Sequence, residues 1–171
     1  MKNKSTKSSL LFETREYSLG NEGPIIVAYQ LKSPENMGHI IRLASNFGCR
    51  KVIFVGDELS VRASKIKKVA GAAQGQVEWS FVSEDCWMDS IDAGYELVAI
   101  ETADNSNNIF LSNLKGKVAF LLGNEIYGLA DELVQKCSQA VHIPMVGAIK
   151  SMNVSHACGV AMYEWVRQNL I

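Results

Sequence analysis

The chain has 171 residues, of which 47% are hydrophobic, and its formal net charge is −1 at pH 7. That length suits one domain with a sizeable core, and no apolar run approaches the roughly 18 residues of a membrane-spanning helix. The N-terminal stretch MKNKSTKSSLLFETREY is polar, with only a brief apolar SLLF, so it does not fit a signal peptide. We therefore expect a cytoplasmic protein without a membrane segment.

Short apolar runs alternate with segments whose apolar residues recur at helical spacing. Residues 1–22 predict a polar tail or a short helix, and residues 23–171 predict one domain without a linker or an internal repeat. The elements expected in chain order are strand 24–30, helix 36–48, strand 51–56, helix 61–71, strand 77–82, helix 84–93, strand 95–102, strand 117–123, helix 129–137, strand 140–145 and helix 152–169.

Strands that alternate with helices indicate an α/β fold with a mostly parallel sheet. Because the strands are short and apolar, we expect helices on both faces of the sheet. Ligands of such sheets gather at the carboxyl ends of the strands. The common fingerprints are missing there: no GxGxxG follows the first strand, and neither GxxxxGK[ST] nor GxSxG occurs. Any binding site must use other residues.

The charges are unevenly distributed along the chain. Residues 1–68 hold 12 of the 17 basic residues and six acidic ones, whereas residues 69–114 hold eight acidic residues and no Lys or Arg. Such a chain presents either one basic face despite its neutral total or ordinary solvated surfaces.

None of the four cysteines belongs to a metal-binding or redox motif. Cys49, Cys86, Cys137 and Cys158 form no CxxC pair, and no histidine lies at zinc spacing from them. We therefore expect buried free thiols and no metal site.

Three segments carry polar residues where a strand or loop passes into a helix. In SPENMGHIIRLASNFG, residues 33–48, Asn36 and Gly38 open the helix, and Arg42 lies one turn beyond Gly38 on the same face. Gly38 has no side chain that would block a ligand. Taken alone, Arg42 fits a surface arginine lying over the helix equally well.

The second segment is LLGNEIYGL, residues 121–129. Asn124 and Glu125 follow the end of a strand, and Gly128 lets the chain turn into the next helix. Taken alone, this segment predicts an ordinary strand–turn–helix connection with a capping asparagine.

The third segment is GAIKSMNVSHACG, residues 147–159, just ahead of the apolar stripe of the last helix. Ser151, Asn153 and Ser155 lie where several backbone N–H groups are free, and one N-cap would satisfy part of that need. The additional polar groups, beside a loop that contains Gly147, suggest a binding site.

In this order and spacing, the three segments resemble the SpoU (TrmH-like) branch of the SPOUT methyltransferases. The matching motifs are N-x-G-x-x-x-R followed by F-G at residues 36–48, L-G-N-E-x-x-G-L at 122–129, and I-P-M followed by S-L-N-V-S at 143–155. Met152 replaces the leucine of the last motif, which is a mild apolar change. His156 stands where a smaller residue is expected.

The resemblance covers about residues 24–168 and implies the SPOUT fold, in which the C-terminal segment threads through a loop as a deep trefoil knot. It implies a homodimeric enzyme that transfers a methyl group from S-adenosylmethionine to a ribose 2′-hydroxyl of RNA. Transfer RNA is a slight favourite over ribosomal RNA, because compact members of the branch often act on it. Spare apolar surface, including Trp165 on the last helix, would serve the dimer.

The resemblance also implies roles for individual residues. Arg42 binds the phosphate beside the target ribose or the developing alkoxide, which favours loss of the hydroxyl proton. Asn36 orients Arg42 or the ribose, and Glu125 fixes Arg42 or its loop. Ser151 and Asn153 hold the pocket or contact the target nucleotide. The residues expected to bind the cofactor are Thr102, Leu122, Gly123, Asn124, Ile143, Met145, Met152, Asn153 and Ala157.

A basic surface is expected to contact RNA phosphates without reading the base sequence. Its candidate residues are Arg50, Lys51, Arg62, Lys65, Lys67 and Lys68. Two other interpretations stay open. The chain could be an RNA-binding module that keeps the fold without catalysis, or a different α/β nucleotide-binding domain whose motifs match by chance.

Overall fold

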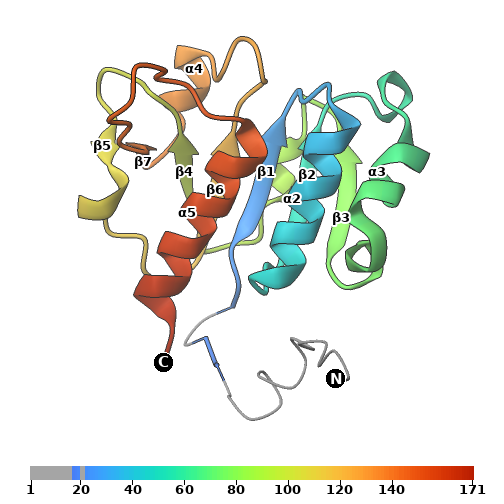
Figure 1. Cartoon of the computed structure of the whole chain (residues 1–171), viewed down its shortest axis with the longest axis horizontal. Coiled ribbons are helices and arrows are strands. Elements are labelled where there is room, and N and C mark those ends of the chain that lie inside the picture. The colour runs from blue at the N-terminus through green and yellow to red at the C-terminus, as the bar shows by residue number, and fades with distance from the viewer. Residues whose placement is uncertain (1–16, 20–21) are drawn as a thin grey trace, which may run out of the picture.

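The computed structural model describes residues 17–19 and 22–171, so most of the expected tail at 1–22 lies outside the described residues. Seven strands form one sheet in the order β3-β2-β1-β6-β4-β7-β5, and each neighbouring pair runs parallel (Figure 1). The strands are β1 (Ile25–Tyr29), β2 (Lys51–Val55), β3 (Glu78–Val82), β4 (Glu96–Ile100), β5 (Asn107–Asn108), β6 (Val118–Leu122) and β7 (Gln139–His142).

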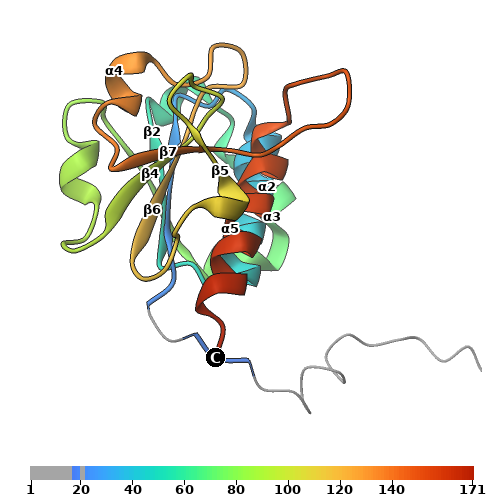
Figure 2. The same ribbon diagram turned by 90° about the vertical axis from the view of Figure 1, so that its left-hand side faces the viewer.

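Helices cover both faces of this sheet, as predicted. Figure 2 shows α2, α3 and α5 on one side, and α4 with a short 3-10 helix at Trp87–Ser90 on the other. The strands alternate accordingly, since Ile26 packs in the cluster beneath α5 whereas Ile25 and Val27 pack in the opposite one. The helices are α2 (Pro34–Asn46), α3 (Ala63–Ala70), α4 (Asp131–Val134) and α5 (Val154–Asn169).

The start of α2 follows directly from its sequence. The Ser33 side chain accepts a hydrogen bond from the Asn36 N–H at 3.2 Å, and Pro34 takes the first turn, where its missing N–H costs nothing. Ile40 and Ile41 are completely buried against the sheet. The helix is therefore fixed by its cap and its apolar face, and the chain leaves it through Gly48 at a φ of +64°.

Gly38 serves helix packing rather than a ligand, contrary to the expectation from sequence. A Cβ atom at this position would lie 2.5 Å from the Cβ of Val69 on α3 and 2.9 Å from the Ile66 carbonyl oxygen. The missing side chain therefore lets α2 and α3 approach closely. This contact aligns the two helices beside the carboxyl edge of the sheet.

Two predicted helices are much shorter than expected. Residues 84–93 form only the 3-10 helix Trp87–Ser90, in which Trp87 is the one buried residue, and 129–137 contain only the four-residue α4. Their apolar side chains are still used, since Trp87, Leu129 and Val134 lie in the core cluster on their face of the sheet and Ile91 packs against it. The polar loop between β4 and β6 also contains β5, a two-residue strand that exists because it pairs with β7.

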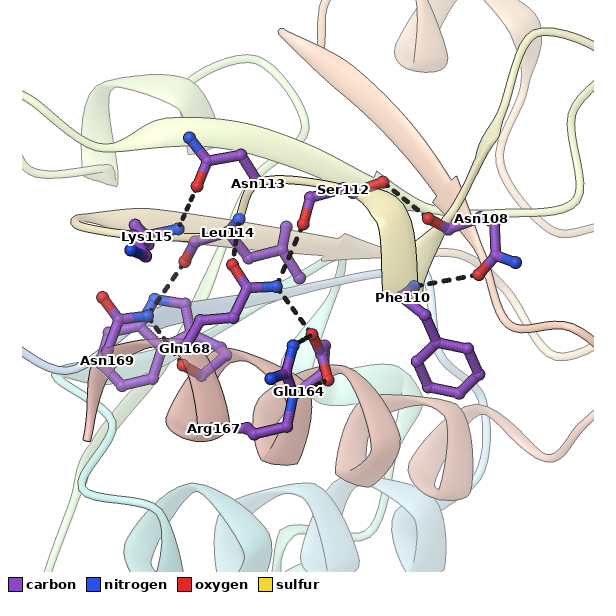
Figure 3. Close-up of polar contacts among 11 residues, drawn as sticks. Asn108, Phe110, Ser112, Asn113, Leu114, Lys115, Glu164, Arg167, Gln168 and Asn169 are labelled. Carbon is purple, nitrogen blue, oxygen red and sulfur yellow. Dashed lines mark hydrogen bonds and ion pairs between the residues drawn. The ribbon is translucent and has the colours of Figure 1, made fainter.

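Polar side chains at the end of α5 fasten this helix to the segment before β6 (Figure 3). Gln168 accepts from the Leu114 N–H at 2.9 Å, and Asn169 accepts from the Gly116 N–H at 2.8 Å. Trp165 donates its indole N–H to the Gly116 carbonyl at 3.0 Å and is completely buried. The expectation that Trp165 adds to an exposed dimer surface is therefore wrong, because its ring fills the core.

The cysteines do not share one environment. Cys49 and Cys158 are buried, as expected, whereas Cys86 is exposed and Cys137 is intermediate. Burial raises the pKa of Cys137 to about 11, so its thiol stays protonated near neutral pH. Within residues 17–19 and 22–171, no three His, Cys, Asp or Glu side chains gather as a metal ion would require. No helix of this part is long and apolar enough to cross a bilayer.

Candidate functional site

A cavity of about 310 Å³ opens at the carboxyl ends of β4, β6 and β7. The segment between β7 and α5 forms one wall, and the turn after β6 forms another. All residues predicted to bind the cofactor line this cavity except Asn153. They are Thr102, Leu122, Gly123, Asn124, Ile143, Met145, Met152 and Ala157. Glu125 and Ser151, predicted as catalytic, line it as well.

The turn after β6 is held rigidly by its own residues. Asn124 donates from its side-chain nitrogen to the Gln30 carbonyl at 2.7 Å, and its side-chain oxygen accepts from the Ile126 N–H at 2.9 Å. Gly123 must lack a side chain, because a Cβ there would lie 2.4 Å from the Gly128 carbonyl carbon. Gly128 itself has a φ of +65°. These contacts explain why the motif needs Asn and Gly at these positions.

Glu101 is a cavity residue that sequence reasoning missed. One carboxylate oxygen accepts from the Thr102 N–H at 2.9 Å, and the other accepts from the Leu129 N–H at 2.8 Å. The side chain thereby joins the end of β4 to the turn after β6. An acidic residue directly after a buried apolar strand was the available signal.

A chain of hydrogen bonds brings the three motif segments together beside this cavity. Glu125 accepts from the Asn36 side chain at 3.0 Å and from the backbone N–H groups of Lys32 and Ser33 at 3.1 and 3.0 Å. Asn153 donates to the Asn36 side-chain oxygen at 3.0 Å and caps α5 by accepting from the Ser155 N–H at 2.9 Å. Asn153 at the start of α5 thus bonds α2 directly and is connected through Asn36 to Glu125 in the turn after β6.

These donors also tune the charge of Glu125. Burial by itself would raise the pKa of this carboxyl group, but the Asn36 amide and the two backbone N–H groups outweigh it, so the pKa lies below its ordinary value. Glu125 is therefore an anion near neutral pH. It holds the loop before α2, the second of its two predicted roles, and it makes no contact with Arg42.

A second depression of about 410 Å³ lies on the other side of this network, and we name it the acceptor groove. Its lining residues are Glu35, Asn36, His39, Arg42, Leu43, Asn46, Asn153, Ser155 and His156. Arg42 is exposed there, and its guanidinium makes no hydrogen bond or ion pair with any residue that the structure describes. An arginine with five unused donors at the edge of a groove suits a phosphate or another anion.

The structure does not bring the predicted basic residues onto one face. Lys65, Lys67 and Lys68 lie on α3, which packs against α2, and Arg62 precedes this helix at its N-cap. Lys65 forms an ion pair with Glu35 of the acceptor groove. Arg50 and Lys51 lie instead at the amino end of β2. Both are bound to Asp92, at 3.3 and 2.6 Å. Arg50 and Lys51 thus lie at the start of β2, whereas the α3 cations follow this strand, and a role of either group in RNA binding stays a prediction.

Comparison with known proteins gives this architecture a family. The model of the SpoU rRNA Methylase family matches residues 23–163, and the chain belongs to this family. A relative from Haemophilus ducreyi, 23S rRNA (guanosine-2′-O-)-methyltransferase RlmB, is 30% identical over 166 residues, which are 92% of this chain and 68% of the relative. The RlmB of Ralstonia nicotianae is also 30% identical, over 98% of this chain and 69% of the relative. The chain thus spans about two thirds of the length of these relatives.

Solved structures share the fold. The SpoU methyltransferase AviRb from Streptomyces viridochromogenes, in complex with the cofactor AdoMet, has a TM-score of 0.78 and 26% identity over 88% of this chain and 59% of its own. A structure described by the 2-OH methylation of C/U34 on tRNA has a TM-score of 0.77 and 25% identity, over 86% of this chain and 96% of its own.

Proposed function

We propose that this protein transfers a methyl group from S-adenosylmethionine to a ribose 2′-hydroxyl of RNA. The observation that carries the proposal is the pair of depressions joined by one hydrogen-bond network. A cavity at the carboxyl ends of β4, β6 and β7 meets a groove in which Arg42 has no protein partner among the described residues. Membership of the SpoU family and relatives named as RNA 2′-O-methyltransferases support the same reaction.

The residues of the cavity fit S-adenosylmethionine. Leu122, Ile143 and Ala157 offer an apolar surface for an adenine ring, and we expect backbone N–H and C=O groups at the strand ends to bond its edge. Glu101 and Glu125 contribute two carboxylates, which favour a cationic ligand. When bound, this cofactor supplies an electrophilic methyl group. Its occurrence in the AviRb structure supports the assignment.

The chain's own residues then prepare the hydroxyl. Arg42 binds the phosphate beside the target ribose or the developing alkoxide, and its positive charge favours loss of the hydroxyl proton. Asn36 and Glu125 hold the start of α2, which keeps Arg42 at a fixed distance from the cavity. Ser151 and Asn153 form the wall between cofactor and nucleotide. Precise placement of the reactants supplies much of the acceleration.

We further propose that residues 23–171 form one SPOUT domain. Its C-terminal segment would thread through a loop and form the deep trefoil knot of the SPOUT fold. β7 lies between β4 and β5, although the segment that joins β4 to β6 carries β5. That segment therefore passes around β7, and its return arm is fastened to α5 through Gly116 and through Leu114, whose bonds Figure 3 shows. A chain that continues from β7 into α5 through such a loop supports a threaded topology.

A homodimer is also part of the proposal. An apolar groove of about 530 Å³ lies between α2, α5 and the 3-10 helix at Ile109–Leu111. Phe110 and Tyr163 in this groove are 59% and 65% exposed, which is unfavourable unless a partner covers them. A second copy of the chain fits that need. Sedimentation analysis tests it, and the variant Tyr163→Glu should shift the protein toward the monomer.

The proposed substrate is a cytoplasmic RNA, either ribosomal RNA or transfer RNA. Curated relatives are named for 23S rRNA, whereas one structural neighbour is described by methylation of tRNA, so both pools are candidates. The deciding experiment uses labelled S-adenosylmethionine with bulk tRNA and, separately, with ribosomal RNA. The RNA is digested to nucleosides and the label is located.

Label on a 2′-O-methyl nucleoside from one pool would support the reaction and choose the substrate. Cofactor binding without label in either pool would favour the alternative, a catalytically silent RNA-binding module of the same fold. The presence of Asn36, Arg42, Glu125 and Asn153, the polar residues of the motifs shared with the methylase family, argues against that alternative.

A further inference from the structure

Apolar side chains are exposed around the mouth of the cofactor cavity. Ile126 and Tyr127, in the turn after β6, line the cavity and are exposed. Val146 and Ile149 are exposed in the segment between β7 and α5, which forms another wall. We name these four residues the apolar rim. Single exposed apolar residues are ordinary, whereas four on two walls of one cavity indicate a surface that a ligand covers.

The turn after β6 holds the backbone of Tyr127 firmly and leaves its ring unused. Asn124 and Gly128 exchange backbone hydrogen bonds at 3.2 and 3.0 Å, and the Asn124 side-chain oxygen accepts from the Tyr127 N–H at 3.3 Å. The Tyr127 side chain is 86% exposed, and no hydrogen bond or ring contact joins it to another residue that the structure describes. The fold therefore gains little from this ring, and a rigid turn presents it at the mouth of the cavity.

Exposed cations border the apolar rim on both walls. Lys150 donates to the Met145 carbonyl at 2.7 Å and so closes the loop between β7 and α5, which Figure 2 shows projecting beyond α5. The backbone N–H of Lys32 bonds Glu125, the neighbour of Ile126, at 3.1 Å. Both lysines are exposed. Cations around an apolar surface suit a polyanion that also carries flat apolar rings, as single-stranded RNA does.

The methyl acceptor of the proposed function brings such rings to this place. A ribose carries its base on C1′, the carbon next to the one that bears the 2′-hydroxyl. A ribose whose hydroxyl reaches the cofactor therefore brings its own base, and the bases of adjoining nucleotides, to the mouth of the cavity. Unpaired bases of this kind are held in RNA-binding proteins by stacking on aromatic side chains.

Tyr127 is the aromatic residue of the apolar rim. Ile126, Val146 and Ile149 are aliphatic and have no flat face on which a base could stack. Phe110 and Tyr163 are also exposed, but they line the apolar groove proposed for a second copy of the chain and do not line the cofactor cavity.

We propose that Tyr127 stacks on an unpaired nucleobase of the RNA segment that carries the target ribose, an inference that rests on the proposed function. The aliphatic residues of the apolar rim border this stack and exclude water from it. Stacking uses the flat face of a base, which every base has, and not its hydrogen-bonding edge. Tyr127 therefore selects single-stranded over paired RNA, without choosing one base and without taking part in the chemical step.

The test measures the affinity of the full chain for a short oligoadenylate and for an RNA duplex of the same length, without cofactor and with S-adenosylmethionine. Tyr127→Leu keeps an apolar side chain but removes the flat face, so it should weaken oligoadenylate binding by about 10-fold or more. Tyr127→Phe and Tyr127→Trp keep that face and should bind at least about half as tightly as wild type. Duplex affinity should change less than about 2-fold in all three variants, because paired bases stack on each other.

Salt dependence separates stacking from electrostatic attraction. Tyr127→Leu should weaken oligoadenylate binding by the same factor at every salt concentration, so its plot of log affinity against log salt runs parallel to that of wild type. Leu111→Ala is the matched control, because Leu111 is also 86% exposed but does not line the cavity. It should leave affinity and slope unchanged. The melting temperature and the affinity for S-adenosylmethionine should stay the same in Tyr127→Leu, since the ring serves neither.

Three results would overturn the inference. The first is wild-type affinity of Tyr127→Leu for oligoadenylate, or an equal loss for the duplex. The second is weaker binding of S-adenosylmethionine with unchanged RNA affinity, which would make the ring a cover of the cofactor. The third is a change in sedimentation alone, which would mean that a second copy covers the apolar rim.

Methyl transfer then separates the inference from the proposed function. With the RNA pool that accepts label, Tyr127→Leu should raise KM for RNA by about 10-fold, while kcat stays within about 3-fold of wild type. An unchanged KM in a protein that transfers label would overturn the inference alone. A wild-type protein that binds the cofactor and transfers no label to any RNA would overturn the proposed function, and the oligoadenylate affinities would decide the stacking separately.

Discussion

The two ends of the sheet differ in how their charged residues are partnered, although the carboxyl end also holds one ion pair, between Glu35 and Lys65. At the amino end, Lys51 bonds Asp92 at 2.6 Å, Arg50 bonds the same carboxylate at 3.3 Å, and Lys117 bonds Glu22 at 3.3 Å. At the carboxyl end, Glu125 is satisfied by amides and Arg42 has no partner among the described residues. Charges paired within the protein serve the fold, whereas a free cation beside a groove is available to a ligand.

The difference also explains why position in the sequence is a poor guide to a binding face. Arg50 and Lys51 are close in sequence to the cations of α3, yet they lie at the start of β2 and share the carboxylate of Asp92. Exposed ion pairs of this kind contribute little stability. Because both cations are engaged by Asp92, we expect them to attract RNA less than the cations of α3 do.

The largest effect should come from exchanging the free arginine for lysine. Arg42→Lys removes the two-pronged donor and should lower single-turnover methyl transfer by about 100-fold or more. The melting temperature should stay unchanged, because Arg42 has no partner among the described residues of the fold. Arg50→Lys is the matched control and should leave the rate unaltered. Equal rates for wild type and Arg42→Lys would contradict the role of the Arg42 guanidinium in methyl transfer, and with it the functional difference between the two ends.

Glu125→Gln tests whether the carboxyl end depends on one partly buried anion. The amide loses the charged acceptor for three N–H donors, so unfolding free energy at pH 7 should fall by about 1 kcal/mol. Since the folded pKa of Glu125 is lowered, the wild-type advantage is full above the ordinary carboxyl range and disappears as pH falls through the folded pKa. Urea titrations across pH measure this. Glu132→Gln on the surface of α4 is the control, and an equally large decrease there would contradict the assignment.

RNA affinity should depend on the cations of α3 and not on those of the amino end. Replacing Lys67 and Lys68 with Ala should weaken binding several-fold and reduce the steepness of its salt dependence by about one unit for each phosphate that no longer meets a cation. Arg50→Ala, also at an exposed cation, should change neither quantity. Filter binding over a range of salt concentrations gives both numbers. Equal weakening in the two variants would mean that RNA covers both ends.

The smallest effect should come from the amino end itself. Asp92→Asn breaks the ion pairs with Lys51 and Arg50 and should cost less than about 1 kcal/mol at pH 7. The hydrogen bond from Lys51 lowers the pKa of Asp92, so this small stabilisation is lost only as pH falls below the ordinary carboxyl range. Thermal unfolding at pH 7 and at acidic pH checks the sign. A larger cost than that of Glu125→Gln would reverse the ranking of the two ends.

Much of the fold could be predicted because local signals and burial agree. The cap at Ser33 and the buried Ile40 define α2, and continuous apolar runs define the strands. The two asparagines of β5 could not be predicted as a strand, because only pairing with β7 makes them one. Trp87 alone could not sustain the helix expected at 84–93.

The functional site, too, could be predicted where local sequence signals decide it and not where long-range packing does. The turn at 122–129 and the start of α5 line the cavity because their polar groups follow strands at one edge of a parallel sheet. The role of Gly38 was mistaken, because a missing side chain looks alike whether it faces a ligand or a neighbouring helix. Arg50 and Lys51 could have been separated from α3 by strand direction alone, since a parallel strand carries its first residues away from the ligand edge.

The hydrogen bonds between the segment before β6 and the end of α5, of which Figure 3 shows those of Leu114, affect the order in which the molecule is completed. The backbone groups of Leu114 and Gly116 find their partners on Gln168 and Asn169, more than fifty residues later in the chain. During synthesis, the flanking strands β5 and β6 are made before Gln168 and Asn169, so the backbone groups of Leu114 and Gly116 have only water as a partner at that stage. Closure of the core is therefore a late event that follows translation of α5, and its rate is set by long-range docking rather than by local helix formation.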